Sequence, residues 1–294
     1  MHRYFLTGLL MTAAAAMFLC LSPTGSRAAW DPLGILGLGD KVGVVEVTGV
    51  ISKSTPILEE LKRFREDRSI RAVVLRVSSP GGVVGPAQEI MEEVKKTREE
   101  KKVVASLGSV AASGGYYVAC AADLIMANPG TATGSIGVIM QLTNLEQLTK
   151  KLGVDVFSLK AGALKDMGSP FKPLTPEEKA VFQNLLNNIH EQFIADVAQN
   201  RNLPLDKVRT LADGRVFTGK EAKALGLVDA LGNFNDAVEK AGRLGGIKGK
   251  IQTVLPEKKG FSLLKLLFGQ DVEKNLEYLT TPYPEPAFLP PWFR

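Results

Sequence analysis

Between residues 41 and 255 the chain alternates short β-branched runs with segments whose apolar residues recur at helical spacing. We predict strands at residues 41–51, 70–77, 103–107 and 124–127, and helices at 57–64, 86–97, 176–200 and 233–241. A turn is predicted at residues 78–82 (Ser-Ser-Pro-Gly-Gly), where the second strand ends. Strands that alternate with helices favour βαβ units, so we predict an α/β fold with a largely parallel sheet buried on both faces.

The predicted helix at residues 176–200 has the clearest signals in the chain. Thr175 precedes it as the N-cap, and Glu178 completes a capping box. Apolar residues then recur every fourth position as a stripe: Val181, Leu185, Ile189, Phe193 and Val197. His190 neighbours this stripe, which indicates a partly buried helix residue rather than a catalytic one.

The two ends of the chain differ from this central part. Residues 1–28 begin with His2 and Arg3, continue without charge over residues 5–21, and end in small residues, which predicts an export segment. Whether it is a cleaved signal or a retained anchor stays open, and residues 29–40 are a linker. The tail, residues 256–294, holds an apolar stretch at 261–268, predicted to be a short helix docked on the body or on a neighbouring subunit. Its Pro-rich end is expected to be extended.

Composition excludes some classes of protein. The 294-residue chain carries a net charge of only +5 with scattered basic residues, so we expect no nucleic-acid partner. Two cysteines, Cys20 and Cys120, do not make a disulfide framework, and Cys120 is interpreted as a small core residue.

Candidate chemistry centres on Ser113, which stands before Gly114 and Gly115, where bare backbone amides can approach a substrate carbonyl. Gly81 and Gly82 offer a second such pair. The only histidines are His2 and His190, and neither is well placed, so the base for a serine nucleophile is predicted to be a lysine.

Lys165 is the candidate base, because it lies among small and apolar residues that suit a buried amine. A lysine acts as a base only if burial lowers its pKa towards neutrality. The neighbouring Asp166 would act in the opposite direction.

Six motifs in this order make the pattern specific. They are residues 75–82, 110–119, 133–138, 165–170, 214–222 and 226–229. Together they resemble the short, single-repeat form of bacterial signal peptide peptidase A over about residues 41–255, the predicted peptidase domain. The tail carries no matching motif.

This resemblance implies a serine peptidase with a Ser–Lys dyad on the fold shared by Clp protease and crotonases. Ser113 would be the nucleophile, Lys165 the general base, Ser135 the residue that orients the lysine, and Gly114 with Gly81 the oxyanion hole. Ser79 follows Ser78 where many relatives have Asn-Ser, a change expected to leave the loop intact.

The resemblance also implies dome-like homo-oligomeric rings on the membrane, with serine and lysine meeting across a subunit boundary. The expected substrates are remnant signal peptides and other short hydrophobic peptides, cut outside the cytoplasm without metal or ATP.

Three alternatives remain. A crotonase-type enzyme for acyl-CoA would use similar oxyanion amides, but an export segment argues against it. A Clp-like Ser–His–Asp peptidase would require His190. A non-catalytic membrane scaffold would not need the intact set of Ser113, Ser135 and Lys165.

Overall fold

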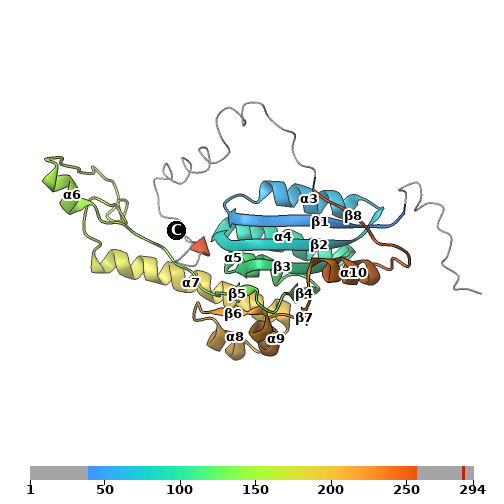
Figure 1. Cartoon of the computed structure of the whole chain (residues 1–294). Coiled ribbons are helices and arrows are strands. Elements are labelled where there is room, and N and C mark those ends of the chain that lie inside the picture. The colour runs from blue at the N-terminus through green and yellow to red at the C-terminus, as the bar shows by residue number, and fades with distance from the viewer. Residues whose placement is uncertain (1–38, 257–286, 289–294) are drawn as a thin grey trace, which may run out of the picture.

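The computed structural model describes residues 39–256 and 287–288, which form one sheet covered by helices on both faces (Figure 1). Its main strand order is β6-β5-β3-β2-β1-β8, with β4 pairing to β3, β7 to β4 and β9 to β2. The strands are β1 (Lys41–Ile51), β2 (Ile70–Val83), β3 (Lys102–Ala112), β4 (Leu124–Ala127), β5 (Ala132–Gly134), β6 (Val216–Thr218), β7 (Ala230–Leu231), β8 (Gln252–Val254) and β9 (Ala287–Phe288). Only β6 and β9 pair in the antiparallel sense within this described part, so the predicted α/β class with a mostly parallel sheet is confirmed.

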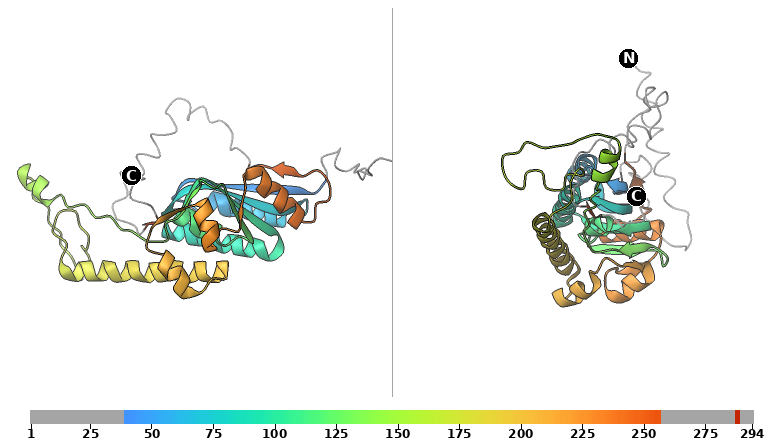
Figure 2. Two further views of the ribbon diagram at one scale, coloured as in Figure 1. Left: turned by 60° about the horizontal axis from the view of Figure 1, so that its bottom comes forward. Right: turned by 90° about the vertical axis from the view of Figure 1, so that its left-hand side faces the viewer.

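The helices divide unequally between the two faces of the sheet (Figure 2). They are α3 (Thr55–Glu66), α4 (Val84–Glu100), α5 (Gly114–Ala119), α6 (Glu146–Lys151), α7 (Pro176–Arg201), α8 (Leu205–Leu211), α9 (Gly219–Leu225) and α10 (Phe234–Leu244). The larger core takes Val45 and Val47 from β1, while Val42 and Val44 point to the smaller core under α10. Strands buried on both faces explain the near-continuous β-branched runs of the sequence.

The predicted turn at residues 78–82 is wrong, because β2 continues through it to Val83. The strand stays paired on both sides, with Ser79 opposite Ala111 of β3 and Gly82 opposite Ile51 of β1. Register shifts in both neighbours absorb the irregular segment. Pairing on both sides gives the backbone hydrogen-bond partners that a turn would otherwise supply.

Helix α7 confirms the predicted capping box, since Thr175 and Glu178 exchange side-chain and backbone hydrogen bonds. Its apolar stripe is buried only in the second half, at Phe193 and Val197. Val181 and Leu185 in the first half are exposed. The periodicity therefore identified the helix correctly, but the core covers only part of it.

Residues 141–175 form a projection that we call the arm. It leaves the sheet after β5, carries α6 at its far end and returns at the start of α7 (Figures 1 and 2). Several apolar side chains of the arm are exposed to solvent, most of all Phe157 at 81% and Leu159 at 95%. The arm thus presents an apolar surface that no other residue of the described part covers.

The predicted export segment and most of the tail lie outside the described residues. Within residues 39–256 and 287–288, no helix has the length and apolar character needed to cross a bilayer. Cys120 is fully buried, and this burial raises the pKa of its thiol to about 12, in line with its interpretation as a core residue.

Candidate active site

Ser113 stands at the corner between β3 and α5. Its backbone is in a rarely populated region, with φ of 53° and ψ of −119°, and the residue is only 2% exposed. Two hydrogen bonds hold this corner: the Ser113 N–H donates to the Gly134 carbonyl oxygen, and the Tyr117 N–H donates to the Ser113 carbonyl oxygen, both at 2.8 Å. Strained backbone of this kind persists only where surrounding structure fixes it, and it clusters at functional sites.

Ser135 repeats this geometry on the neighbouring strand. Ala112 of β3 pairs with Gly134 of β5, so Ser113 and Ser135 leave adjacent strands at the same level. Ser135 also has a positive φ, 51°, is buried, and donates its N–H to the carbonyl oxygen of Arg215 at 2.8 Å. The structure therefore brings the predicted nucleophile and the predicted orienting serine together.

Gly81 and Gly114 belong to two segments that meet beside Ser113. A Cβ added at Gly115 would lie 2.7 Å from the carbonyl oxygen of Ser79, so the start of α5 packs directly on the backbone of β2. Gly81 has a φ of +115°, which favours glycine, and its N–H donates to the Ser79 hydroxyl at 3.1 Å. The amide of Gly81 is therefore engaged in this conformation, whereas Gly114 lies in the first helical turn, where amides lack an intrahelical acceptor.

Lys165 is not brought to Ser113 within one chain. It lies in an exposed turn of the arm, where its backbone N–H donates to the carbonyl oxygen of Gly162 at 3.1 Å. Its side-chain amine makes no hydrogen bond or ion pair with any residue between 39 and 256. The single chain thus brings the predicted nucleophile next to the predicted oxyanion glycines, but leaves the predicted base exposed to solvent.

His190 does not take the place of the lysine. It is half-buried on α7, its Nε2 atom is buried without a hydrogen-bond partner, and no hydrogen bond within the described part of the chain joins it to Ser113. This position supports the interpretation of His190 as a partly buried helix residue rather than a catalytic one.

β9 lies next to the same region, on the edge of β2. Ala287 pairs with Val83 and Phe288 with Gly82, in the antiparallel sense. A short extended segment of the chain therefore hydrogen-bonds to β2 one residue beyond Gly81. The sequence predicted an extended tail end but not this location.

Comparison with known proteins shows the family to which the chain belongs. The model of peptidase family S49 matches residues 95–248, which include Ser113, Ser135 and Lys165. The chain belongs to peptidase family S49.

Relatives of this S49 chain carry protease names. A putative protease of Synechocystis sp. is 43% identical over 209 residues, which cover 70% of this chain and 75% of that protein. A putative signal peptide peptidase SppA of Enterococcus faecium is 40% identical over 62% of this chain and 53% of that protein. Among solved structures, a mutant ClpP1 of Listeria monocytogenes aligns with a TM-score of 0.45 and 16% identity, covering 66% of this chain and 94% of that one. Family and relatives together make the chain a serine-type peptidase.

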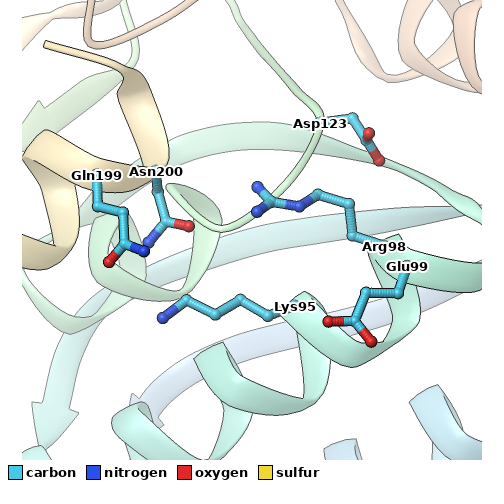
Figure 3. Close-up of a pocket in the computed structure, with 6 residues that line it drawn as sticks. All are labelled: Lys95, Arg98, Glu99, Asp123, Gln199 and Asn200. Carbon is cyan, nitrogen blue, oxygen red and sulfur yellow. The ribbon is translucent and has the colours of Figure 1, made fainter.

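Two surface hollows of this peptidase lie away from Ser113. A hollow of about 410 Å³ is lined by polar side chains at the ends of α4 and α7 and just before β4 (Figure 3): Lys95, Arg98, Glu99, Asp123, Gln199 and Asn200. It adjoins the beginning of β3, whereas Ser113 follows the end of that strand.

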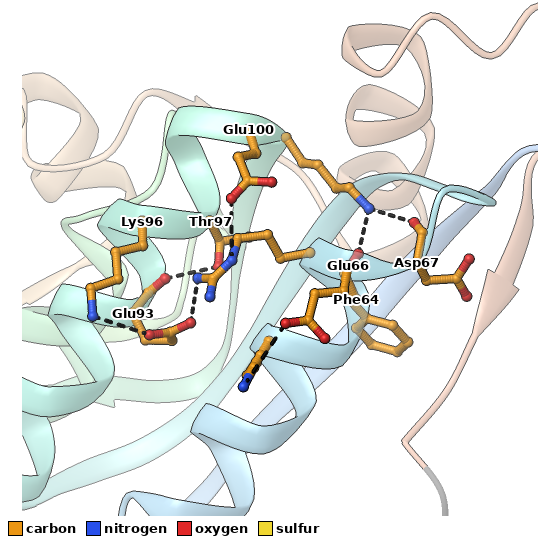
Figure 4. Close-up of polar contacts among 10 residues, drawn as sticks. Phe64, Glu66, Asp67, Glu93, Lys96, Thr97 and Glu100 are labelled. Atoms are coloured by element: carbon orange, nitrogen blue, oxygen red, sulfur yellow. Dashed lines mark hydrogen bonds and ion pairs between the residues drawn. The ribbon is translucent and has the colours of Figure 1, made fainter.

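A second hollow, of about 660 Å³, opens between α3, α4 and α10. Figure 4 shows the polar contacts behind it: Arg65 joins Glu93 and Glu100, and the Lys101 amine donates to two carbonyl oxygens at the end of α3. These contacts tie α3 to α4 and carry no group of the predicted site.

Proposed function

We propose that this chain is a membrane-associated endopeptidase that cuts short hydrophobic peptides, including remnant signal peptides, on the extracytoplasmic side. Ser113 acts as the nucleophile and Lys165 as the base, within a homo-oligomeric ring. The name of the Enterococcus relative, the uncharged run at residues 5–21 and the motif order support this substrate class and location.

The chemistry follows from these roles. The Lys165 amine takes the proton of the Ser113 hydroxyl as its oxygen attacks the peptide carbonyl, and returns that proton to the leaving amine. Water then attacks the acyl ester at Ser113: the Lys165 amine takes a proton from the water and gives it to the Ser113 oxygen as the carboxylic acid product leaves. The amides of Gly114 and Gly81 stabilise the oxyanion, for which Gly81 gives up its bond to Ser79. Ser135 hydrogen-bonds the lysine amine and orients it.

One observation carries this proposal: Ser113 is buried in the body with no hydrogen bond to a base among residues 39–256, while Lys165 is exposed on the arm. A second copy of the chain would complete the site by placing its arm over Ser113. That contact would bury the exposed apolar side chains of the arm and desolvate the lysine. Desolvation lowers the pKa of an amine, which a lysine base requires.

β9 supports the peptide class of substrate. It pairs with β2 beside Gly81 as an antiparallel strand, and main-chain pairing of this kind accepts extended peptides of many sequences. A substrate strand bound there would lie beside the Gly81 amide.

The test is a mixture of two inactive variants, Ser113→Ala and Lys165→Ala. Each variant alone should be inactive. In randomly reassembled rings about one quarter of the sites would join an intact serine to an intact neighbouring lysine, so about a quarter of wild-type activity should return. Rings that form normally in the mixture but stay inactive would refute the shared dyad.

Labelling with a fluorophosphonate probe, read by mass spectrometry, tests the nucleophile separately. We expect modification of Ser113 in the wild type and in His190→Ala, and strongly reduced modification in Lys165→Ala. A wild-type chain that is folded and assembled but unlabelled would instead support the scaffold alternative.

A further inference from the structure

We propose that Asp166, Lys172 and Glu178 are positioning residues for Lys165: they lock the turn that carries the base onto the start of α7. The inference rests on the proposed function, which makes Lys165 the base. None of these three residues touches the reacting atoms.

The turn itself is short and held by its own backbone. The N–H of Met167 donates to the carbonyl oxygen of Leu164, and that of Ser169 to the carbonyl oxygen of Asp166, each at 3.1 Å. Such a turn has a defined shape, but these local bonds do not fix its position on the molecule.

The fixed position comes from an ion network. The Asp166 carboxylate forms ion pairs with two lysine amines: its Oδ1 lies 2.5 Å from Nζ of Lys160 and 2.9 Å from Nζ of Lys172. The Lys172 amine also lies 2.5 Å from the carboxylate of Glu178, which is buried. Glu178 is the capping-box residue of α7, and its other carboxylate oxygen accepts the N–H of Thr175 at 3.1 Å. Lys172 therefore links the lysine-bearing turn to the first turn of a 26-residue helix.

A packing contact reinforces this link. A Cβ added at Gly168 would lie 3.0 Å from the ring of Phe182 on α7, so the turn rests closely against the helix. The N–H of Leu145 also donates to the carbonyl oxygen of Pro170 at 2.6 Å, which joins the outgoing and returning segments of the arm. The turn is thus attached to the helix by charge and by packing.

The network also controls the charge next to the base. A free carboxylate beside Lys165 would favour the protonated amine and raise its pKa, contrary to what a base needs. Hydrogen bonds from Lys160 and then Lys172 lower the pKa of Asp166 to about 2, so its charge is engaged away from Lys165. The charged groups of the network, Lys160 and Lys172 against Asp166 and Glu178, balance one another.

The experiment compares Lys172→Met, Lys172→Arg and the double variant Asp166→Asn/Lys172→Met in the assembled enzyme, using the pH profile of kcat/KM. In Lys172→Met, Asp166 loses one partner and turns to Lys165, so activity should begin about one pH unit higher than in the wild type. Activity at neutral pH should fall about tenfold. Lys172→Arg keeps both ion pairs and should restore the wild-type profile. The double variant lacks the carboxylate, so its profile should not move upward.

Lys150→Gln is the matched control, because Lys150 forms a comparable pair with Glu146 elsewhere on the arm, at 2.6 Å. It should leave activity and profile unchanged. An unchanged profile in Lys172→Met, with or without loss of activity, overturns the inference, as does an upward shift that persists in the double variant. If Lys165→Ala itself stays active, the proposed function fails instead, and that outcome is independent of Lys172.

Discussion

The body and the arm of this S49 peptidase handle their polar groups in opposite ways. In the body, Ser113 and Ser135 are buried at corners with positive φ that strand pairing and backbone hydrogen bonds hold in place. In the arm, Lys165 is exposed, and charged pairs rather than a core fix its surroundings. The body therefore fixes its candidate residues by burial, whereas the arm leaves Lys165 and several apolar side chains exposed.

The largest effect should come from Ser113→Ala. Removing a serine nucleophile lowers kcat on the order of 10⁶-fold in a serine peptidase, while the fold should survive. Peptide hydrolysis and thermal melting would be measured together. Ser109→Ala, an exposed serine on the same strand, is the control and should be fully active. Comparable activity in both variants would remove Ser113 from the mechanism.

Gly115→Ala tests the close packing of α5 against β2 in the body. The added methyl would meet the Ser79 carbonyl oxygen and separate α5 from β2, moving the Gly114 amide relative to Gly81. We expect a loss of stability of about 1–3 kcal/mol and a fall in kcat of about 10²-fold. Gly85→Ala is the matched control, since nothing lies within 4 Å of its added Cβ. Equal kinetics in the two variants would mean that the spacing of these segments is unimportant.

A double change in the arm, Phe157→Ser with Leu159→Ser, tests its apolar surface. Burial of each such side chain contributes roughly 1.5–3 kcal/mol, so their loss should weaken assembly by at least tenfold without lowering the melting temperature of the isolated chain. Activity and mass in solution would be followed against protein concentration. Leu205→Ser, on a half-exposed site of α8, should not affect assembly. Unchanged assembly in the arm variant would show that this surface has another use.

The smallest effect near neutral pH concerns stability. The body and the arm should lose stability at opposite ends of the pH range. Burial raises the pKa of Tyr116 and Tyr117 above 10.0 and that of Cys120 from 9.0 to about 12. The unfolded chain loses these protons more readily, so the body is fully stabilised below pH 9 and loses stability as the pH rises beyond 9 to 10. Asp166 behaves in the opposite sense: its contribution is present above pH 3.8 and is lost as the pH falls towards 2.

Two measurements check this contrast. Tyrosinate absorbance in alkali should appear for the buried tyrosines only together with loss of circular dichroism. Limited digestion with pepsin should open the arm before the body as the pH falls from 4 to 2. Ionised tyrosines in a still-folded body, or an arm equally resistant across that acid range, would contradict the contrast.

Much of the body could be predicted from sequence, because burial on both faces leaves a direct trace in residue type. The β-branched run at β1 and the capping box at Thr175 are local signals of this kind. The prediction of a turn at residues 78–82 failed because Pro-Gly-Gly favours a turn locally, whereas pairing with two neighbouring strands keeps this segment extended. Tertiary contacts override local preference there.

The candidate site could be predicted only in part, because its residues leave local motifs in the sequence but their arrangement depends on tertiary contacts. Motif order pointed to Ser113, Ser135, Gly81, Gly114 and Lys165, but the adjacency of the two serines depends on the pairing of Ala112 with Gly134. The role of Lys172 has only a weak local trace, a lysine six residues before a capping glutamate and six after an aspartate. The exposure of Val181 and Leu185 depends on what covers a helix, which apolar spacing does not record.

The backbone at Ser113, the proposed nucleophile, also restricts which nucleophilic side chains this position can carry. At a φ of 53° a β-branched side chain is strongly disfavoured, so threonine would be a poor replacement although it has the same hydroxyl. Cysteine has no branch at Cβ and would fit. Efforts to redesign the peptidase as a thiol enzyme or a ligase therefore have an open route at this corner, while an N-terminal-threonine style of chemistry has none.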